Sequence, residues 1–158
     1  MQIFIMRHGQ AEMMADSDAE RNLTDVGREE SELMAKYFVE KQVTFDAVMV
    51  SPFVRAQQTW ESVNPFFDAL DNIQILECLT PSGSAHSAVD EILALQAQGV
   101  KSVLIVSHLP LVGYMVGELV PSAGVPAFAP SAAAHILLND DDGFAELIDI
   151  ITVSQIRS

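Results

Sequence analysis

The chain has 158 residues, the size of one domain, and 49% of them are hydrophobic, which excludes a disordered chain and provides a substantial core. Its formal net charge of -14 makes nucleic acid a poor partner, because both molecules are strongly anionic. Since the chain has only eight Lys and Arg, a phosphate site must gather its cations locally.

Cys78 is the single cysteine, so no disulfide can form within the chain, which is typical of a reducing compartment. The N-terminus has no basic leader, and its apolar stretch is too short for a signal peptide. Residues 103–120 are nearly long enough to span a bilayer, but the polar and proline residues at 107–110 divide them into a strand and a helix. We therefore expect a cytoplasmic protein with no membrane segment.

The N-terminal quarter predicts a strand followed by a helix. Residues 2–6 are an apolar run typical of a buried strand, and this strand leads directly into Arg7-His8-Gly9. Residues 10–22 are polar and turn-like. Thr24 then has the position of an N-cap, and apolar residues at helical spacing predict a helix to about Lys41.

A second strand and helix follow. Residues 47–50 form a short apolar run typical of a strand. Ser51 and Pro52 have the pattern of an N-cap and a first helical residue. The predicted helix carries Arg55 and ends near Val63.

The third and fourth strands are expected at residues 73–76 and 103–106. Between them, a turn at 81–83 precedes a helix that ends near Gly99, a residue type common just after a helix. A helix over residues 110–119 follows the fourth strand.

A loop rich in Pro, Ala and Gly at residues 121–130 leads to two apolar segments, 132–138 and 144–151, and we leave open whether this loop docks a partner or merely connects two elements. The sequence Asn-Asp-Asp-Asp-Gly at 139–143 joins the segments and is typical of a hairpin turn. Strands that alternate with helices predict a mostly parallel sheet covered on both faces. The fold class is therefore α/β, a three-layer α/β/α arrangement with a mixed sheet and a C-terminal antiparallel hairpin.

Three polar features follow predicted strands: Arg7-His8-Gly9, Arg55 and His108. Ligands of open α/β sheets bind beyond the carboxyl ends of the strands, so these residues are expected to meet there. Each also has an ordinary interpretation. Arg7-His8-Gly9 could be an incidental tripeptide, Arg55 a solvated helix residue, and His108 a hydrogen-bonded histidine of the core. His86 and His135 have no supporting context and receive that ordinary interpretation.

The sequence resembles the histidine phosphatase (phosphoglycerate mutase-like) superfamily. Arg7-His8-Gly9 near the N-terminus is the signature of that superfamily. Within it, the short length and residues 107–114 are similar to bacterial phosphohistidine phosphatases. The likeness covers nearly the whole chain in order and spacing, and it includes Leu23-Thr24-Asp25-Val26-Gly27, Ser51-Pro52-Phe53-Val54-Arg55-Ala56-Gln57-Gln58-Thr59 and Val106-Ser107-His108.

The resemblance implies that His8 is a nucleophile that becomes phosphorylated, and that Arg7, Arg55 and His108 bind the phosphoryl group. Phosphoryl transfer spreads negative charge over the phosphoryl oxygens. A guanidinium group is positively charged and can donate two parallel hydrogen bonds to these oxygens, so arginines suit this site. His8 must offer one neutral nitrogen to phosphorus, and its other nitrogen is expected to donate to a carbonyl such as that of Gly9. Gly9 itself lets the backbone approach closely. No metal or other cofactor is implied.

One position departs from the superfamily pattern. Many relatives carry a glutamate after the third strand that protonates the leaving group, but the aligned position here is Cys78. Glu77 is one residue away, and on a strand a shift of one residue points the side chain to the face opposite the site. A bulge could return the Glu77 side chain to the face of the site. Glu77 is therefore either a general acid or a solvated carboxylate. Loss of the acid favours a phosphohistidine substrate, because imidazole leaves more easily than an alkoxide.

The connection after the third strand is too short for the insertion that caps the pocket in larger relatives, so residues 1–158 are expected to form a single domain with an open site. Arg21 either contacts the incoming partner or a second phosphate, or is an ordinary surface residue.

We expect a metal-independent phosphatase, monomeric, that removes phosphate from a histidine on a signalling protein: a histidine-containing phosphotransfer domain or a phosphotransferase-system protein. One alternative is a phosphatase of small phosphomonoesters. Another is a non-catalytic module that binds phosphohistidine.

Overall fold

Six strands form one sheet in the computed structural model, which describes residues 1–158. They are β1 (Gln2–Arg7), β2 (Ala47–Val50), β3 (Ile73–Ile75), β4 (Ser102–Ser107), β5 (Ala133–Leu138) and β6 (Ala145–Ile151). The strand order is β3-β2-β4-β1-β5-β6, in which the first four are mutually parallel and β5 is antiparallel to both of its neighbours. The predicted mixed sheet and C-terminal hairpin are confirmed.

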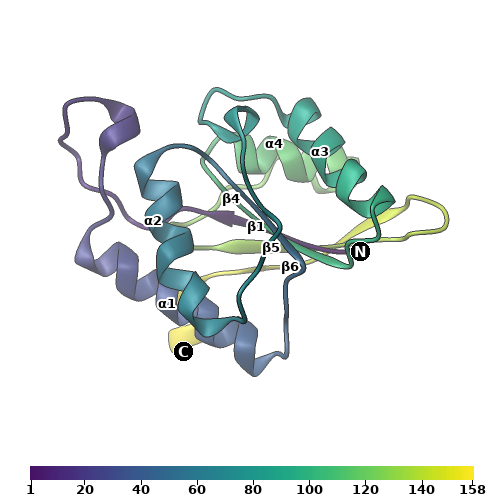
Figure 1. Cartoon of the computed structure of the whole chain (residues 1–158), viewed down its shortest axis with the longest axis horizontal. Helices are drawn as coiled ribbons and strands as arrows, with labels where there is room; N and C mark the ends of the chain where they lie inside the picture. The colour runs from purple at the N-terminus through teal and green to yellow at the C-terminus, as the bar shows by residue number, and fades with distance from the viewer.

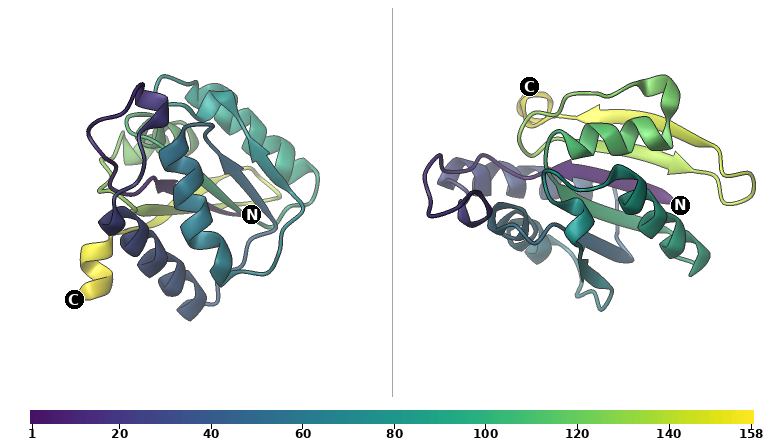
Figure 2. Two further views of the ribbon diagram at one scale, coloured as in Figure 1. Left: turned by 60° about the vertical axis from the view of Figure 1, so that its left-hand side comes forward. Right: turned by 90° about the horizontal axis from the view of Figure 1, so that it is seen from above.

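Helices cover both faces of the sheet, as the α/β/α prediction requires. They are α1 (Asp25–Glu40), α2 (Val54–Val63), α3 (Ala85–Ala97), α4 (Leu111–Leu119) and α5 (Val153–Arg157). Figures 1 and 2 show α1 and α2 on one side of the strands and α3 and α4 on the other. The loop after β1 projects past the sheet on the side of α2 (Figure 1).

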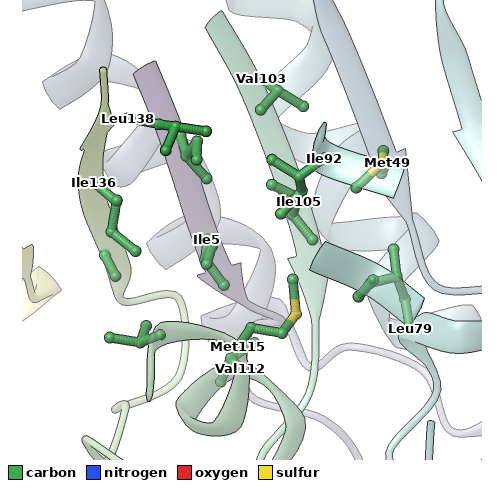
Figure 3. Close-up of a cluster of buried hydrophobic side chains, with 14 of the residues drawn as sticks. Ile5, Met49, Leu79, Ile92, Val103, Ile105, Val112, Met115, Ile136 and Leu138 are labelled. Carbon is green, nitrogen blue, oxygen red and sulfur yellow. The ribbon is translucent and has the colours of Figure 1, made fainter. Parts of the chain in front are cut away.

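Two hydrophobic cores lie on the two faces, because successive strand residues point in opposite directions. Ile5 of β1 packs in the core under α3 and α4, close to Met115 (Figure 3). Phe4 of the same strand packs in the other core, where its ring lies edge-on to that of Phe38. With both faces covered, a central strand has no solvent side, which explains why β4 is buried at every position.

Local signals set two of the helix ends as predicted. The Thr24 hydroxyl accepts a hydrogen bond from the Gly27 N–H at 3.0 Å, so Thr24 is the N-cap of α1. Gly99 follows α3 with a φ of +89°, a left-handed conformation that glycine adopts without strain.

The prediction for the start of α2 was wrong. Ser51 does not cap this helix, and Pro52 is not in it; the helix begins at Val54 with Phe53 at the N-cap position and no side-chain cap. The Ser51 hydroxyl instead accepts from the Phe53 N–H, one residue before the helix, and lies within hydrogen-bond distance of His108.

The short helix α5 was not predicted, although Thr152 and Gln155 form a capping box that is legible in the sequence. It extends the chain beyond β6, and its Val153 is buried in the core that contains α1 and α2. No helix in the structure combines the length and apolar character needed to cross a bilayer.

Candidate active site

The strand register brings the predicted site residues together. Arg7 of β1 is paired with Ser107 of β4, and Val50 of β2 is paired with Val106. The residues that follow these strands therefore emerge side by side at the carboxyl edge of the sheet, where ligands of such sheets bind. Arg7, His8, Arg55 and His108 all line one cavity of about 290 Å³.

The hydrogen bonds of His8 define its tautomer. Its Nδ1 lies 2.7 Å from the Gly9 carbonyl oxygen, which can only accept, so Nδ1 carries the proton, as expected from the sequence. Its Nε2 lies 3.3 Å from Nε of Arg55, which can only donate, so Nε2 holds a lone pair. Both contacts therefore select a neutral ring with a free pair on Nε2.

The electrostatic surroundings keep His8 neutral. Burial and the positive charges of Arg55 and Arg7 together lower its pKa to about 4, burial being the largest cause, whereas the hydrogen bond to Gly9 acts in the opposite direction. The side chain is 7% exposed. At neutral pH the lone pair of Nε2 is thus available to an electrophile.

Arg55 is a buried cation on the first turn of α2. Besides the bond to His8, its Nη1 donates to the Asp18 carbonyl oxygen at 2.6 Å and its Nη2 to the Asp18 carboxylate at 3.1 Å. Its guanidinium lies over the Phe53 ring, 5.1 Å from the centroid. Burial lowers the pKa of Arg55, and Asp18 raises it in compensation.

Arg7 approaches the cavity from β1. Its Nη1 donates to the Phe128 carbonyl oxygen at 2.8 Å, and its Nε is buried without a hydrogen-bond partner. Burial, followed by the nearby charge of Arg55, lowers the pKa of Arg7. Phe128 and the cavity residue Pro130 both belong to loop 121–130, so this loop forms part of the site wall rather than a simple connection.

His108 is 1% exposed, and its ring centroid lies 5.0 Å from that of His8. Its Nε2 is 2.7 Å from Oγ of Ser51, and its Nδ1 is buried without a partner. Burial, followed by the charges of His8 and Arg55, lowers the pKa of His108 to about 2. The ring is therefore neutral at any ordinary pH.

The loop that carries His8 is fixed by close backbone packing. A Cβ added to Gly9 would lie 2.6 Å from the Gly27 carbonyl oxygen, a distance that no side chain tolerates. The Gly9 N–H donates to Oγ1 of Thr59 at 3.0 Å. The close approach expected of Gly9 is present, and it attaches the nucleophile loop to α1 and α2.

The structure brings Arg21 to the cavity but leaves Glu77 outside it. Arg21 lines the wall, and its guanidinium donates to the Asp18 carboxylate at 2.9 Å and to the Glu12 carbonyl oxygen at 3.1 Å. Glu77 begins a 3-10 helix, Glu77–Leu79, and its side chain is exposed and does not line the cavity. This placement fits the solvated interpretation of Glu77. The thiol of Cys78 is half-buried, and burial raises its pKa.

Other polar groups lie elsewhere. His86 pairs with Asp90 and Glu118 on the surface, and His135 stacks on Phe4 and hydrogen-bonds with Gln2. A larger cavity of about 400 Å³ beside Gln2 lies at the opposite end of β1 and contains none of the four predicted site residues. No group of three or more His, Cys, Asp or Glu side chains is placed to hold a metal ion.

Sequence reasoning missed two residues that contact the site. Asp18 is one of 22 acidic residues, and nothing in the local sequence marks it as the partner of Arg55. Ser51 was predicted to be a helix cap, and its contact with His108 joins residues 57 positions apart.

Comparisons with known proteins place the chain among histidine phosphatases. The family model of the histidine phosphatase superfamily (branch 1) matches residues 3–80, which include Arg7, His8 and Arg55. The chain is 45% identical over 140 residues to phosphohistidine phosphatase SixA of Escherichia coli strain K12, covering 89% of this chain and 87% of that protein. It is 46% identical to the SixA homolog of Haemophilus influenzae, covering 87% of this chain and 88% of the homolog.

The same likeness holds in three dimensions. A solved structure of the protein histidine phosphatase SixA complexed with tungstate superimposes with a TM-score of 0.95 at 41% identity, and the match covers 99% of both chains. A structure of the α-ribazole phosphatase from Shigella flexneri, at 19% identity and a TM-score of 0.70, shares the fold.

Proposed function

Because the chain belongs to the histidine phosphatase superfamily, we propose that it removes phosphate from phosphohistidine on another protein through a phosphorylated His8. Arg7, Arg55 and His108 bind the phosphoryl group in this proposal. Its relatives in Escherichia coli and Haemophilus influenzae are phosphohistidine phosphatases by name, and the similarity covers most of both chains.

One observation carries the proposal: the opposed hydrogen bonds of His8. Nδ1 donates to Gly9, and Nε2 accepts from Arg55. The ring therefore presents an unprotonated nitrogen inside a cavity with two guanidinium groups. A nucleophile beside fixed cations is the arrangement that phosphoryl transfer needs.

The reaction has two displacements. The lone pair of His8 Nε2 attacks phosphorus, a bond from Nε2 to phosphorus forms, and the bond from phosphorus to the substrate imidazole breaks. Water then attacks the phosphoryl group on His8, the bond to Nε2 breaks, and both water protons leave with the phosphate as H2PO4⁻, which returns His8 to its neutral form. Arg7 and Arg55 neutralise the charge on the phosphoryl oxygens in both steps.

The walls of the cavity favour a nitrogen leaving group. They contain cationic, neutral polar and apolar side chains, and the exposed Glu77 is not among them. An imidazole that carries a proton on its far nitrogen departs as a neutral ring and needs no acid, whereas an alkoxide does. This chemistry supports phosphohistidine over sugar phosphates.

Access to the site supports a protein substrate. Strand β3 is joined to α3 by residues 76–84, a connection that includes only one short 3-10 helix and no cap. We propose that residues 1–158 form a single histidine phosphatase domain, active as a monomer. Its partner is a histidine-containing phosphotransfer domain or a phosphotransferase-system protein, whose phosphohistidine reaches into the open cavity.

The direct test uses purified phosphotransfer domains and phosphotransferase-system proteins that carry radioactive phosphate on histidine. The chain should release inorganic phosphate in the presence of chelators, and acid-labile label should be trapped on the enzyme. His8→Ala should abolish release and labelling and keep the circular dichroism spectrum of the parent. A fully active His8→Ala variant would end the assignment of His8 as nucleophile.

The same preparation separates the alternatives. A phosphatase of small phosphomonoesters would hydrolyse a panel of sugar phosphates faster than phosphohistidine protein. A binding module would retain the phosphorylated partner and form no labelled enzyme.

A further inference from the structure

Ser51 and His108 form a buried pair at the back of the cavity. Oγ of Ser51 lies 2.7 Å from Nε2 of His108, and neither residue is more than 1% exposed. The serine follows β2, the histidine follows β4, and the register of these strands places them side by side. The contact therefore depends on the fold and not on neighbouring sequence.

The hydrogen bonds of Ser51 decide which group donates. Its Oγ already accepts from the Phe53 N–H at 3.2 Å, and the only other polar atom within reach is Nε2 of His108. If Nε2 carried the proton, the serine hydroxyl would accept twice and its own proton would be buried without an acceptor, which is costly. The economical arrangement has Ser51 donate to Nε2.

This arrangement places the histidine proton on Nδ1. A neutral imidazole has one donor and one acceptor nitrogen, so a ring that accepts at Nε2 must donate at Nδ1. Nδ1 of His108 is one of two buried side-chain nitrogens in the structure with no partner, and the other is Nε of Arg7. Both belong to residues that line the same cavity.

We propose that Ser51 is a positioning residue that fixes the tautomer of His108, so that the Nδ1 proton is reserved for a phosphoryl oxygen. A buried donor without a partner is rare in folded proteins, and it is explained here by a ligand that supplies the acceptor. This inference rests on the proposed function, since the phosphoryl group is that ligand.

The surroundings of His108 hold the ring in place for this purpose. The Phe53 ring packs edge-on against it at 5.2 Å, and the His8 ring lies on another side at 5.0 Å. Burial lowers the pKa of His108 to about 2, so a second proton is not available to make both nitrogens donors. Because the ring stays neutral, its donor must be assigned by a partner, and Ser51 is the partner present.

The tautomer can be measured without any turnover. Nitrogen NMR of the side-chain histidines distinguishes protonated from unprotonated ring nitrogens. In the parent protein, His108 should show a protonated Nδ1 and an unprotonated Nε2. Ser51→Ala should change this pattern, whereas Ser107→Ala should not. Ser107 is an apt control because its hydroxyl is equally buried and donates at 2.7 Å, but to the Leu79 carbonyl oxygen.

Kinetics and oxyanion binding test the consequence. Ser51→Ala should lower kcat on phosphohistidine protein about 10- to 100-fold and weaken tungstate binding about tenfold. This is less than the roughly 100- to 1000-fold loss when an oxyanion donor is removed outright, because the His108 ring remains in the variant. Ser107→Ala should change kcat less than about threefold, because it removes no donor to the oxyanion. Ser51→Thr, which keeps the hydroxyl, should restore much of the loss.

The outcomes separate this inference from the proposed function. A protonated Nε2 on His108 in the parent, or a Ser51→Ala variant whose tungstate affinity equals that of Ser107→Ala, overturns the role of Ser51. If Ser51→Ala does not fold, the parent spectrum alone decides. A parent that has the expected tautomer and binds tungstate, yet releases no phosphate from phosphohistidine, refutes the proposed function and leaves the tautomer assignment standing.

Discussion

Arg55 donates a hydrogen bond from Nε to Nε2 of His8 across 3.3 Å, so a buried cation touches the nitrogen that we assign as nucleophile. The same guanidinium holds Asp18 with its other two nitrogens. Arg55 therefore links the nucleophile to the loop in front of it. An incoming phosphoryl group must compete with Asp18 for these donors.

Arg55→Lys tests whether this fork is needed. The planar guanidinium of arginine presents three nitrogens, which contact His8 and Asp18 at the same time. A lysine has a single ammonium group, which cannot make all of these contacts at once. We expect kcat/KM on phosphohistidine protein to fall by about 100-fold or more, in line with the loss of a fixed oxyanion donor. Phosphate release and thermal unfolding should be measured on the same preparations.

Arg157→Lys is the matched control, because Arg157 makes exposed ion pairs with Glu29 and Glu30 far from the cavity. Its activity should equal that of the parent. If Arg55→Lys were folded and as active as Arg157→Lys, the guanidinium would have no special role.

The strand ends could be predicted from the sequence because each is marked by a local pattern. An apolar run followed by Arg7-His8 or by Ser107-His108 can be recognised in the sequence alone. Parallel strands then bring such ends together at the carboxyl edge of the sheet. The order and type of the elements follow from the same periodicity.

The contacts between these ends could not be predicted. Ser51 followed by Pro52 has the local pattern of a helix start, and the strand register overrides it by placing the hydroxyl against His108. Glu77 and Cys78 were ambiguous because a 3-10 turn, rather than a continued strand, follows β3. In a strand, successive side chains point to opposite faces, but in a 3-10 turn they do not, so the direction of Glu77 and Cys78 could not be obtained by counting along the strand.

Asp18→Asn should tighten the binding of oxyanions. The Asp18 carboxylate partly neutralises Arg55 and repels a phosphoryl group, while its backbone carbonyl would still hold Nη1 in the variant. The carboxylate is 60% exposed, so solvent screens the effect. We expect the dissociation constant of tungstate to fall about two- to fivefold, and the gain to shrink at high salt.

Asp16→Asn serves as the control, because Asp16 is an exposed residue of the same loop and does not contact Arg55. Calorimetric titration of both variants at low and high salt measures the difference. Equal affinities in the two variants would mean that Asp18 does not compete for the site.

Glu77→Gln should be almost without effect on phosphohistidine. The side chain is exposed and lies outside the cavity, so the substitution removes no group near the phosphoryl site. We expect kcat to stay within about twofold of the parent at every pH, since general acid catalysis is worth far more than that where it operates. A drop in kcat of about tenfold or more, with loss of the alkaline limb of the pH–rate profile, would show that Glu77 is the general acid.

The pH dependence of folding should report the neutral state of His8. Burial lowers its pKa in the folded protein to about 4, while the unfolded value is 6.5. Between these values the unfolded chain binds more protons, so the contribution of His8 to stability is complete above pH 6.5 and is lost as the pH falls. Linkage predicts that this residue alone removes about 2 kcal/mol of unfolding free energy between pH 7 and pH 5.

Urea unfolding of the parent and of His8→Ala at pH 7 and pH 5 measures this contribution. The variant has a different stability at pH 7, but only the change with pH is compared. His135 also has a lowered pKa and His86 a raised one; these contributions occur in both proteins and cancel in the difference. His8 helps to lower the pKa of His108, but burial is the larger cause and remains in the variant, so His108 stays neutral in both folded proteins at pH 5 and pH 7. Asp18 and Asp140, whose pKa values are lowered, affect stability mainly below pH 4. The parent should therefore lose about 2 kcal/mol more than the variant, and equal losses would show that His8 is protonated in the folded state at pH 5.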